Sequence, residues 1–270
     1  MLVPSGRNIV TDQKFNSDEN NSCYSNTTFT RLIAKKQKFT KVDFKYSNFD
    51  SCYLRECQFD SCDFTGCRFV GSNFHGSVFV GCKFDYTYFE KTNIDATILE
   101  TESPALENIR LRFARTLRTN FQHLGDARSI NRAISIELRA TGEHLYNSWR
   151  SPGSYYRKKY SGFYARIRQF LLWSEFKALD FIWGNGESIL KLIRFALIFI
   201  SGISILNVYL YGDAKSLDSY WNSLADAPSI FLGVNSPANY NKAYLAFIAL
   251  IRLIVIGFFL SIIIKRFNRR

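Results

Sequence analysis

The sequence predicts a multi-domain membrane protein with three parts: a repeat solenoid, an α-helical connector, and a pair of membrane-spanning helices. Three observations carry this prediction. A large apolar residue recurs at every fifth position in much of the first hundred residues, a basic segment follows, and two long apolar runs come after it. The net charge of +12 lies wholly after residue 100, because residues 1–100 hold 12 Lys and Arg against 12 Asp and Glu. A uniformly basic globule is thereby excluded.

The five-residue repeat is the strongest of these signals. Thirteen consecutive positions from Phe39 to Leu99 carry Phe, Leu or Ile at a spacing of five, and the series extends backward to Tyr24. A small Ser, Thr or Cys stands two positions before the large residue in every unit from Ser47 onward. Neither the period of a helix nor that of a strand gives this spacing. The chain is therefore expected to turn a corner every five residues.

These units resemble the pentapeptide-repeat family, whose units read small, polar, Leu or Phe, and two further residues. The resemblance covers about residues 22–100, and residues 1–21 are expected to be a polar lead. It implies a right-handed quadrilateral β-helix in which four units make one square coil, with the large residues stacked inside. It also implies a little over three coils, whose ends need caps.

Five of the six cysteines occupy the small interior position of this repeat. We expect buried, reduced thiols that serve as small packing groups, with disulfides between coils or a metal ladder as the alternatives. The sequence has no CxxC pair and no cysteine–histidine spacing typical of zinc, so no cofactor is expected. The balanced charge of the repeat argues against nucleic acid as a partner.

A basic helical connector is predicted for residues 104–188. Ser103 followed by Pro104 is typical of a helix start, and Gly125 before Asp126 breaks the helix and begins a second one. The later part of the connector interleaves basic and aromatic residues. That pattern fits a nucleic-acid surface or a helix lying on an anionic leaflet, and the apolar run that follows favours the membrane.

Two runs, 189–211 and 243–264, are each long and apolar enough to cross a bilayer. Basic residues flank the start of the first run and the end of the second, where residues 265–270 form a basic tail. The positive-inside rule therefore places both termini in the cytosol of a multi-pass protein in the cell (inner or plasma) membrane. The N-terminus does not read as a signal peptide.

The loop between the spans, residues 216–240, is expected to be re-entrant. Ser216 or Asp218 would cap a short helix that ends at Pro228, and an apolar stretch containing Gly233 follows. A loop in water has little reason to carry so many large apolar residues. Irregular backbone at membrane depth is tolerated where it is enclosed by protein or lines a water-filled cavity.

The order of span, short helix, glycine turn and span resembles the two-helix pore module of the potassium-channel superfamily. Bacterial proteins that fuse this module to pentapeptide repeats share two further features, matched here by Gly125-Asp126 and by Trp183-Gly184-Asn185-Gly186-Glu187. The resemblance implies a homo-oligomeric, tetrameric channel for monovalent ions, gated by its cytosolic part. It places these residues in the pore loop: Ser229, Phe231, Leu232, Gly233, Val234, Asn235 and Ser236.

This loop departs from a potassium filter, which reads Thr-Val-Gly-Tyr-Gly-Asp and replaces the water around the ion with rings of carbonyl oxygens. The threonine, second glycine and aspartate are absent from this chain. Without the second glycine the same carbonyl geometry is harder to adopt. We therefore expect a wider or less selective pore.

Arg252 lies near the centre of the second span, where a charge is costly. Gly257 and Ser261 share one helix face, which is expected to line the pore. Arg252 points about 140° and about 180° away from them. Two roles remain open: a structural pair with Asp226, or a role in gating or selectivity.

No catalytic constellation is visible, so an enzyme is not expected. Besides the channel, two functions remain open. One is a membrane-damaging defence or cell-death effector that forms a poorly selective pore. The other is a non-conducting, membrane-tethered interaction scaffold, in which the loop merely packs the helical hairpin.

Overall fold

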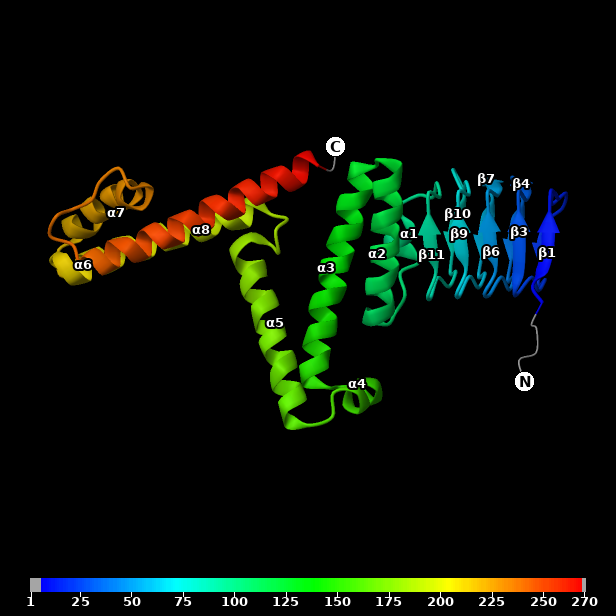
Figure 1. Ribbon diagram of the computed structural model, residues 1–270, viewed down its shortest axis with the longest axis horizontal. Coiled ribbons are helices and arrows are strands. Elements are labelled where there is room, and N and C mark those ends of the chain that lie inside the picture. The colour runs from blue at the N-terminus through cyan, green and yellow to red at the C-terminus, as the bar shows by residue number, and fades with distance from the viewer. Residues whose placement is uncertain (1–5, 269–270) are drawn as a thin grey trace. The chain divides into compact units, whose positions relative to one another are not determined.

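A computed structural model of the chain describes residues 6–268 (Figure 1). The chain divides into two compact units, one extending to Phe170 and the other comprising Leu171–Asn268. The first unit holds a β-solenoid and helices that follow it. The second holds two long apolar helices with a shorter helix between them in the chain. The predicted order of solenoid, connector and apolar helices is confirmed.

The solenoid makes about four turns of short parallel strands. Its strands form three sheets, in the orders β1-β3-β6-β9-β11, β10-β8-β5-β2 and β4-β7. The remaining side is held by single bridges that link Cys23, Asp43, Asp63 and Lys83. The strands are β1 (Asn8–Thr11), β2 (Glu19–Asn20), β3 (Thr27–Thr30), β4 (Ile33–Lys35), β5 (Lys38–Thr40), β6 (Asn48–Asp50), β7 (Tyr53–Arg55), β8 (Gln58–Asp60), β9 (Arg68–Val70), β10 (Val78–Val80) and β11 (Tyr88–Glu90).

The corners of the solenoid confirm the five-residue period. Every fifth residue from Asn21 to Lys91 has a positive φ, between 49° and 72°. This left-handed conformation redirects the chain two residues after each large apolar residue. One turn therefore takes twenty residues, as the pairing of Phe29 with Phe49 and of Phe49 with Phe69 shows.

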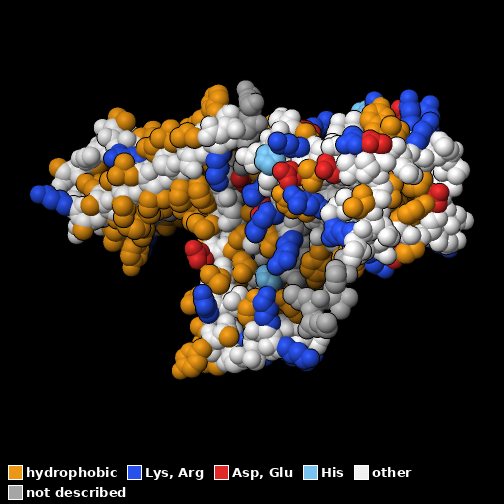
Figure 2. All heavy atoms as spheres, turned by 45° about the vertical axis from the view of Figure 1, so that its right-hand side comes forward, with side chains coloured by type: hydrophobic (Ala, Val, Ile, Leu, Met, Phe, Trp, Pro, Cys, Tyr) orange, Lys and Arg blue, Asp and Glu red, His pale blue; other side chains and the backbone are white. Residues whose placement is uncertain are grey.

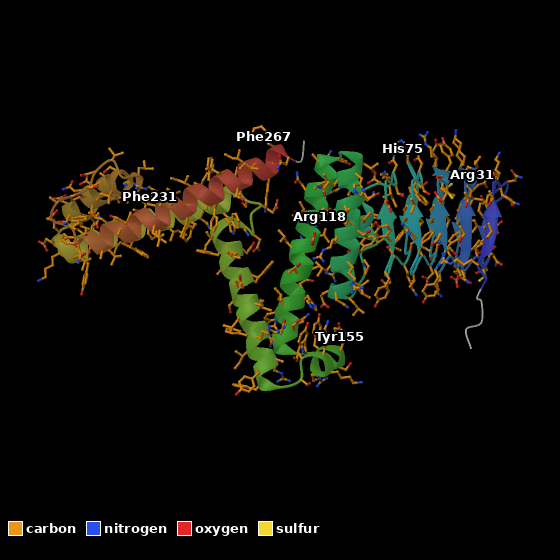
Figure 3. The ribbon with its side chains drawn as sticks, viewed as in Figure 1. Arg31, His75, Arg118, Tyr155, Phe231 and Phe267 are labelled. Atoms are coloured by element: carbon orange, nitrogen blue, oxygen red, sulfur yellow. The ribbon has the colours of Figure 1, made fainter. Side chains whose placement is uncertain are left out.

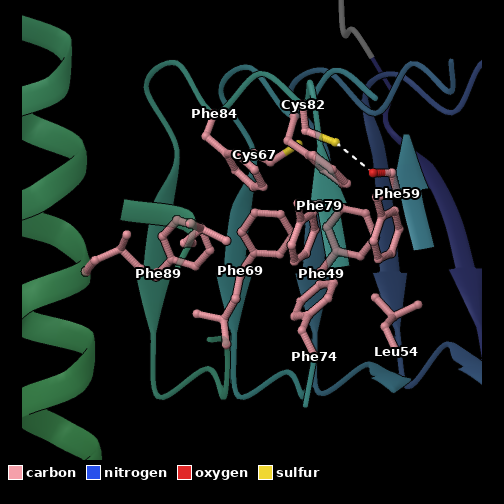
Figure 4. Packing of buried hydrophobic residues seen from close by; sticks show 14 of the residues in the cluster. Phe49, Leu54, Phe59, Cys67, Phe69, Phe74, Phe79, Cys82, Phe84 and Phe89 are labelled. Atoms are coloured by element: carbon pink, nitrogen blue, oxygen red, sulfur yellow. Dashed lines mark hydrogen bonds between the residues drawn. The ribbon is translucent and has the colours of Figure 1, made fainter. Parts of the chain in front are cut away.

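Aromatic stacks fill the interior. Phe44, Phe64 and Phe84 stack with centroid distances of 5.1 Å, and Phe39, Phe59 and Phe79 stack with distances of 4.9 Å. A third stack, through Phe49, Phe69 and Phe89, is visible in Figure 4. Rings on neighbouring sides meet largely edge to face, the geometry favoured by the charge distribution of an aromatic ring. The fourth side is aliphatic in part, with Ala34, Leu54, Phe74 and Ile94.

The small residues form a second interior system that ties successive turns together. The backbone N–H of Cys52 donates to Ser72 Oγ in the next turn at 3.1 Å, and that hydroxyl donates back to the Phe49 carbonyl at 3.1 Å. The same pattern joins Cys57 to Ser77. Each hydroxyl thus satisfies buried backbone groups that the narrow sheets leave unpaired.

The solenoid begins earlier than the repeat phase indicates. Residues assigned to a polar lead form β1 and β2, and β1 pairs with β3 in a register that joins Val10 to Phe29. This first turn is one residue short, since that pair is nineteen apart, whereas Glu19 and Phe39 are twenty apart. The missing residue breaks the phase, so the pattern in the sequence fades although the turn is built. Residues 1–5 of the predicted lead lie outside the described residues.

A helix closes the last turn. In α2 (Glu107–Leu124), buried Asn120 accepts a hydrogen bond from the Thr92 N–H at 2.8 Å and donates one to the Thr92 carbonyl at 2.7 Å. Thr116 Oγ1 accepts from the Phe89 N–H, and Phe113 packs on Phe84 and Phe89. Side chains of α2 therefore provide the hydrogen bonds and apolar contacts that a further turn of the solenoid would have provided.

The predicted helix start at Ser103 and Pro104 is wrong. A short helix, α1 (Ile98–Thr101), follows the last unit, and α2 begins only at Glu107. Between them, the buried Glu102 carboxylate accepts from the Cys82 N–H at 2.6 Å and so occupies the place of the next small residue in its column. The residues around Ser103 therefore complete the end of the solenoid instead of starting a helix.

The other connector helices are α3 (Ala127–Arg150), α4 (Ser154–Lys159) and α5 (Phe163–Trp183). The predicted break at Gly125 is confirmed, since Gly125 ends α2 in a left-handed conformation and the Asp126 side chain caps α3. Two ion pairs with Glu137, from Arg115 and Arg118, join α2 to α3. Helix α5 has no buried residue, and Phe163 and Tyr164 are strongly exposed.

Five cysteines are buried in the solenoid and Cys23 is exposed. Burial raises the pKa of Cys52 from its ordinary value of 9.0 to about 11, and it also raises the pKa of Cys57 and Cys67. Cys82 Sγ donates to the Phe59 carbonyl (Figure 4). A buried, protonated thiol is a poor nucleophile.

We therefore expect a maleimide at pH 7 to modify Cys23 in the folded protein and all six cysteines after denaturation, as counted by intact mass. The free energy of unfolding should be unaffected by these thiols below pH 9 and fall as the pH rises from about 9 towards 11, because unfolded thiols ionise there while Cys52 does not. Replacing Cys52, Cys57 and Cys67 by Ser, which other turns already use, should remove that part of the fall. Rapid modification of several thiols in the folded protein would contradict the burial.

Candidate functional site

The second unit contains two candidate membrane-spanning helices, α6 (Ile189–Tyr211) and α8 (Lys242–Phe267), which fit the predicted runs. They have 23 and 26 residues, against the roughly 20 that a bilayer core requires. In their most apolar windows only 17% and 11% of the residues are buried, whereas the core helix of a soluble protein is mostly buried. Figure 2 shows the hydrophobic side chains gathered over this unit. Arg269 and Arg270 of the predicted tail lie outside the described residues.

Helix α7 (Leu217–Leu232) lies between these helices in the chain and packs back on both. Ser216, one of the two predicted caps, occupies the N-cap position, but its side chain makes no capping hydrogen bond. Pro228 does not end the helix, which continues for one more turn to Leu232. The buried face of that turn explains the difference, because Ala227, Ile230 and Phe231 form a core with Ile203 of α6 and Ile248 of α8.

Two contacts locate the C-terminal end of α7 at half the length of its neighbours. Phe231 meets Phe199 edge to face with a centroid distance of 5.9 Å, and Phe199 is the eleventh residue of α6. Gly233 faces the guanidinium of Arg252, which is the eleventh residue of α8. Nearer the α7 N-terminus, Ser223 Oγ donates to the Ser204 carbonyl at 2.9 Å. The segment thus descends about halfway along the hairpin and then returns.

The turning point favours a glycine. Gly233 has a φ of +78°, and a Cβ placed on it would overlap the Arg252 guanidinium. The turn is closed by three backbone hydrogen bonds: the Gly233 N–H donates to Ile230, and the N–H groups of Val234 and Asn235 both donate to Ser229. A side chain at this position would therefore strain the backbone and displace the Arg252 guanidinium.

The predicted pore-loop residues divide into two groups. Phe231 is buried in the hairpin core, only 6% exposed, on the α7 face that packs against α6 (Figure 3). The exposed group after the helix is Leu232, Gly233, Val234, Asn235 and Ser236. Ser229 lies between the two groups, half-buried, with its hydroxyl donating to the Asp226 carbonyl.

Arg252 and Asp226 do not pair in the chain. Over residues 6–268, no ion pair involves either side chain, and the Arg252 guanidinium lies against Gly233 instead. The Asp226 side chain is on an exposed part of α7. On α8, Gly257 faces open space and Ser261 is half-buried.

An elbow of residues 183–188 connects α5 to α6 and holds the far end of α8. Trp183 stacks on Phe258 with a centroid distance of 4.0 Å, and Lys265 Nζ lies 3.9 Å from Glu187 Oε1. Lys191 pairs with Asp180 at 2.7 Å. The aromatic-Gly-x-Gly-Glu stretch is visible in the sequence, but nothing there indicates that Phe258 is the partner of Trp183.

At the opposite end of the hairpin, tyrosines gather. Tyr211 stacks on Tyr240 with a centroid distance of 4.2 Å, and the Tyr244 hydroxyl donates to Asn207 Oδ1 at 2.9 Å.

Within the described part of the chain, no three His, Cys, Asp or Glu side chains are grouped as a metal site would need.

Comparison with known families gives two matches, both to pentapeptide repeats. One model, of 8 copies, matches residues 38–76, and another, of 9 copies, matches residues 59–100. Comparison with curated proteins gives no match.

Solved structures that are similar include the plasmid-mediated fluoroquinolone resistance protein QnrB1, at 18% identity and a TM-score of 0.20. That match covers 34% of this chain and 64% of the QnrB1 chain. A pentapeptide repeat protein from the Arabidopsis thaliana thylakoid lumen matches at 17% identity and a TM-score of 0.18, over 37% of this chain and 76% of its own. The N-terminal part of this chain is therefore a pentapeptide-repeat β-solenoid domain, followed by a helical region with two long apolar helices.

Proposed function

We propose that the second unit is the pore module of a homo-oligomeric ion channel, with four copies around an axis. The descent of α7 to half the depth of α6 and α8 carries this proposal. It would leave the exposed segment from Gly233 to Ser236 inside the bilayer, where backbone polar groups need either protein or water. Two spans in one copy cannot enclose a channel, whereas several copies can surround a water-filled axis with these segments.

The rest of the chain would regulate this pore from the cytosol. Helix α5 carries exposed aromatic residues among basic ones, a composition that suits an anionic leaflet. The elbow joins α5 to the end of α8 through Trp183 and Phe258. A displacement of α5 would thus reach the helix proposed to line the pore. Both termini would be cytosolic in the cell membrane.

Reconstitution in vesicles tests the proposal. Purified protein should run as a tetramer in detergent, by light scattering, and should release ions from vesicles under an imposed gradient. Gly233→Ala should reduce the flux at least tenfold, because the new methyl group displaces Arg252 and strains the turn. Gly202→Ala is the matched control, since Gly202 lies in helix α6 with open space around it.

A monomer that conducts nothing under any lipid or voltage condition would overturn the channel and favour the interaction scaffold. Growth arrest on expression, relieved by Gly233→Ala, would favour the membrane-damaging effector. The loop itself supports that second candidate: Val234, which follows the turn glycine, is 82% exposed, and residues 235–241 contain no second glycine. Such a loop lacks the closely spaced carbonyl rings of a selective filter.

A further inference from the structure

The formal charge at mid-depth of the proposed conduction path is of one sign only. Residues 227–241, which include the turn and the exposed loop, contain no acidic or basic residue. Between Lys242 and Lys265 on α8, Arg252 is the single charged residue, and α6 has none after Arg194. An ion at mid-depth would therefore meet one kind of formal charge, and it is positive.

The Arg252 guanidinium lies where a re-entrant helix would otherwise favour cations. The C-terminal end of a helix carries roughly half a negative charge, and in a pore it would stabilise a cation near the axis. Here the α7 helix ends at Leu232, and the guanidinium of Arg252 lies against the next residue, Gly233. A full positive charge offsets the helix end and leaves a net positive charge in each copy.

This position is also adjacent to the exposed loop. Gly233 has no side chain to separate Arg252 from whatever passes the loop, and Arg252 is itself half-buried rather than enclosed in the hairpin core. The charge is not neutralised by a carboxylate in the described chain, since Asp226 does not reach it. Guanidinium groups bind small anions through several N–H donors.

We propose that Arg252 sets the charge selectivity of the pore and makes it favour small monovalent anions such as chloride over potassium. This inference rests on the proposed channel. Four copies would place four guanidinium groups around the axis at one depth, separated from it by the Gly233 turns. The field of this ring lowers the energy of an anion and raises that of a cation in the same place.

Reversal potentials in planar bilayers test the inference. With a tenfold KCl gradient across the bilayer, the reversal potential of the wild-type current should be shifted from zero towards the chloride equilibrium potential. Arg252→Gln should lower the chloride-to-potassium permeability ratio by about tenfold or more, because the ring of charge is removed. Arg252→Lys keeps the charge and should keep the sign of the reversal potential. Detergent stability and oligomeric state of each variant are measured in parallel.

The outcomes separate this inference from the channel itself. Cation-selective current that Arg252→Gln leaves unchanged would overturn the inference and leave the channel standing. A loss of stability in Arg252→Gln without any shift in reversal potential would make Arg252 a structural cap of α7, which also overturns it. If wild type passes no current at all, the proposed channel fails, and the selectivity role fails with it.

Discussion

Replacing Phe64 by alanine is expected to lower the free energy of unfolding of the solenoid by about 4–5 kcal/mol. Phe64 lies in the middle turn, is fully buried, and stacks between Phe44 and Phe84 at 5.1 Å on either side. Truncation leaves a ring-sized cavity that parallel strands on a fixed spacing cannot close. The lost ring contacts add to the cost of the cavity.

Urea unfolding of the full chain in detergent measures this effect, with modification of the buried cysteines as the signal for the opening of the solenoid. A pair of leucine variants separates ring stacking from burial. Phe64→Leu should cost about 1–2 kcal/mol more than Phe74→Leu, because the neighbours of Phe74 in its own column are Leu54 and Ile94 rather than rings. Equal costs would show that stacking adds nothing to burial.

Asn120→Leu is expected to destabilise the same domain by about 3–4 kcal/mol. The leucine fills a similar volume but leaves both the N–H and the carbonyl of Thr92 without the partners that Asn120 provides at 2.8 and 2.7 Å. Buried backbone groups that lose their partners cost far more than the hydrogen bond itself contributes. The last turn should therefore open first.

The control is Asn108→Leu, on the same helix at a partly exposed position, which should change stability by less than about 0.5 kcal/mol. Asn120→Asp provides a second comparison, because aspartate can accept from the Thr92 N–H but cannot donate to its carbonyl. If Asn120→Leu unfolds at the wild-type urea concentration, α2 does not close the solenoid through these bonds.

The repeat could be predicted because each of its rules is local. A large residue every fifth position and a small one two places earlier determine the corner, the interior side and the register together. The first turn escaped prediction because one residue is missing between Val10 and Glu19, and the phase then no longer matches. A pattern read at fixed spacing cannot follow a turn that is one residue short.

The closure of the solenoid could not be predicted from the sequence. Ser103 and Pro104 are typical of a helix start. The Glu102 carboxylate is nevertheless buried in the interior, because it accepts the hydrogen bond of the Cys82 N–H. Asn120 looks like an ordinary helix residue until Thr92, twenty-eight positions earlier, is known to lie beside it. Buried backbone N–H and carbonyl groups need hydrogen-bond partners, and here the partners are distant in the sequence. Such pairs produce no periodic pattern in the sequence.

In the helical hairpin, the composition of the sequence was enough to predict the two apolar helices, but not which side chains contact each other. Helical phase separates Arg252 from Gly257 and Ser261, but it leaves open whether Arg252 pairs with Asp226. In the structure the Arg252 guanidinium lies against Gly233, because the turn brings backbone rather than a side chain to the middle of α8. The burial of Phe231 could not be predicted from the sequence either, because the direction of its side chain depends on how α7 packs.

The twenty-residue turn makes the solenoid a spacer whose length changes in whole steps. Each turn passes the same donors and acceptors to the next, so removing residues 47–66 would join Tyr46 to Cys67 at an equivalent corner and leave the join to α2 untouched. One turn alters the reach of the domain by about 4.8 Å, the distance between paired strands. Evolution could therefore adjust how far this domain extends from its helical cap without redesigning either end.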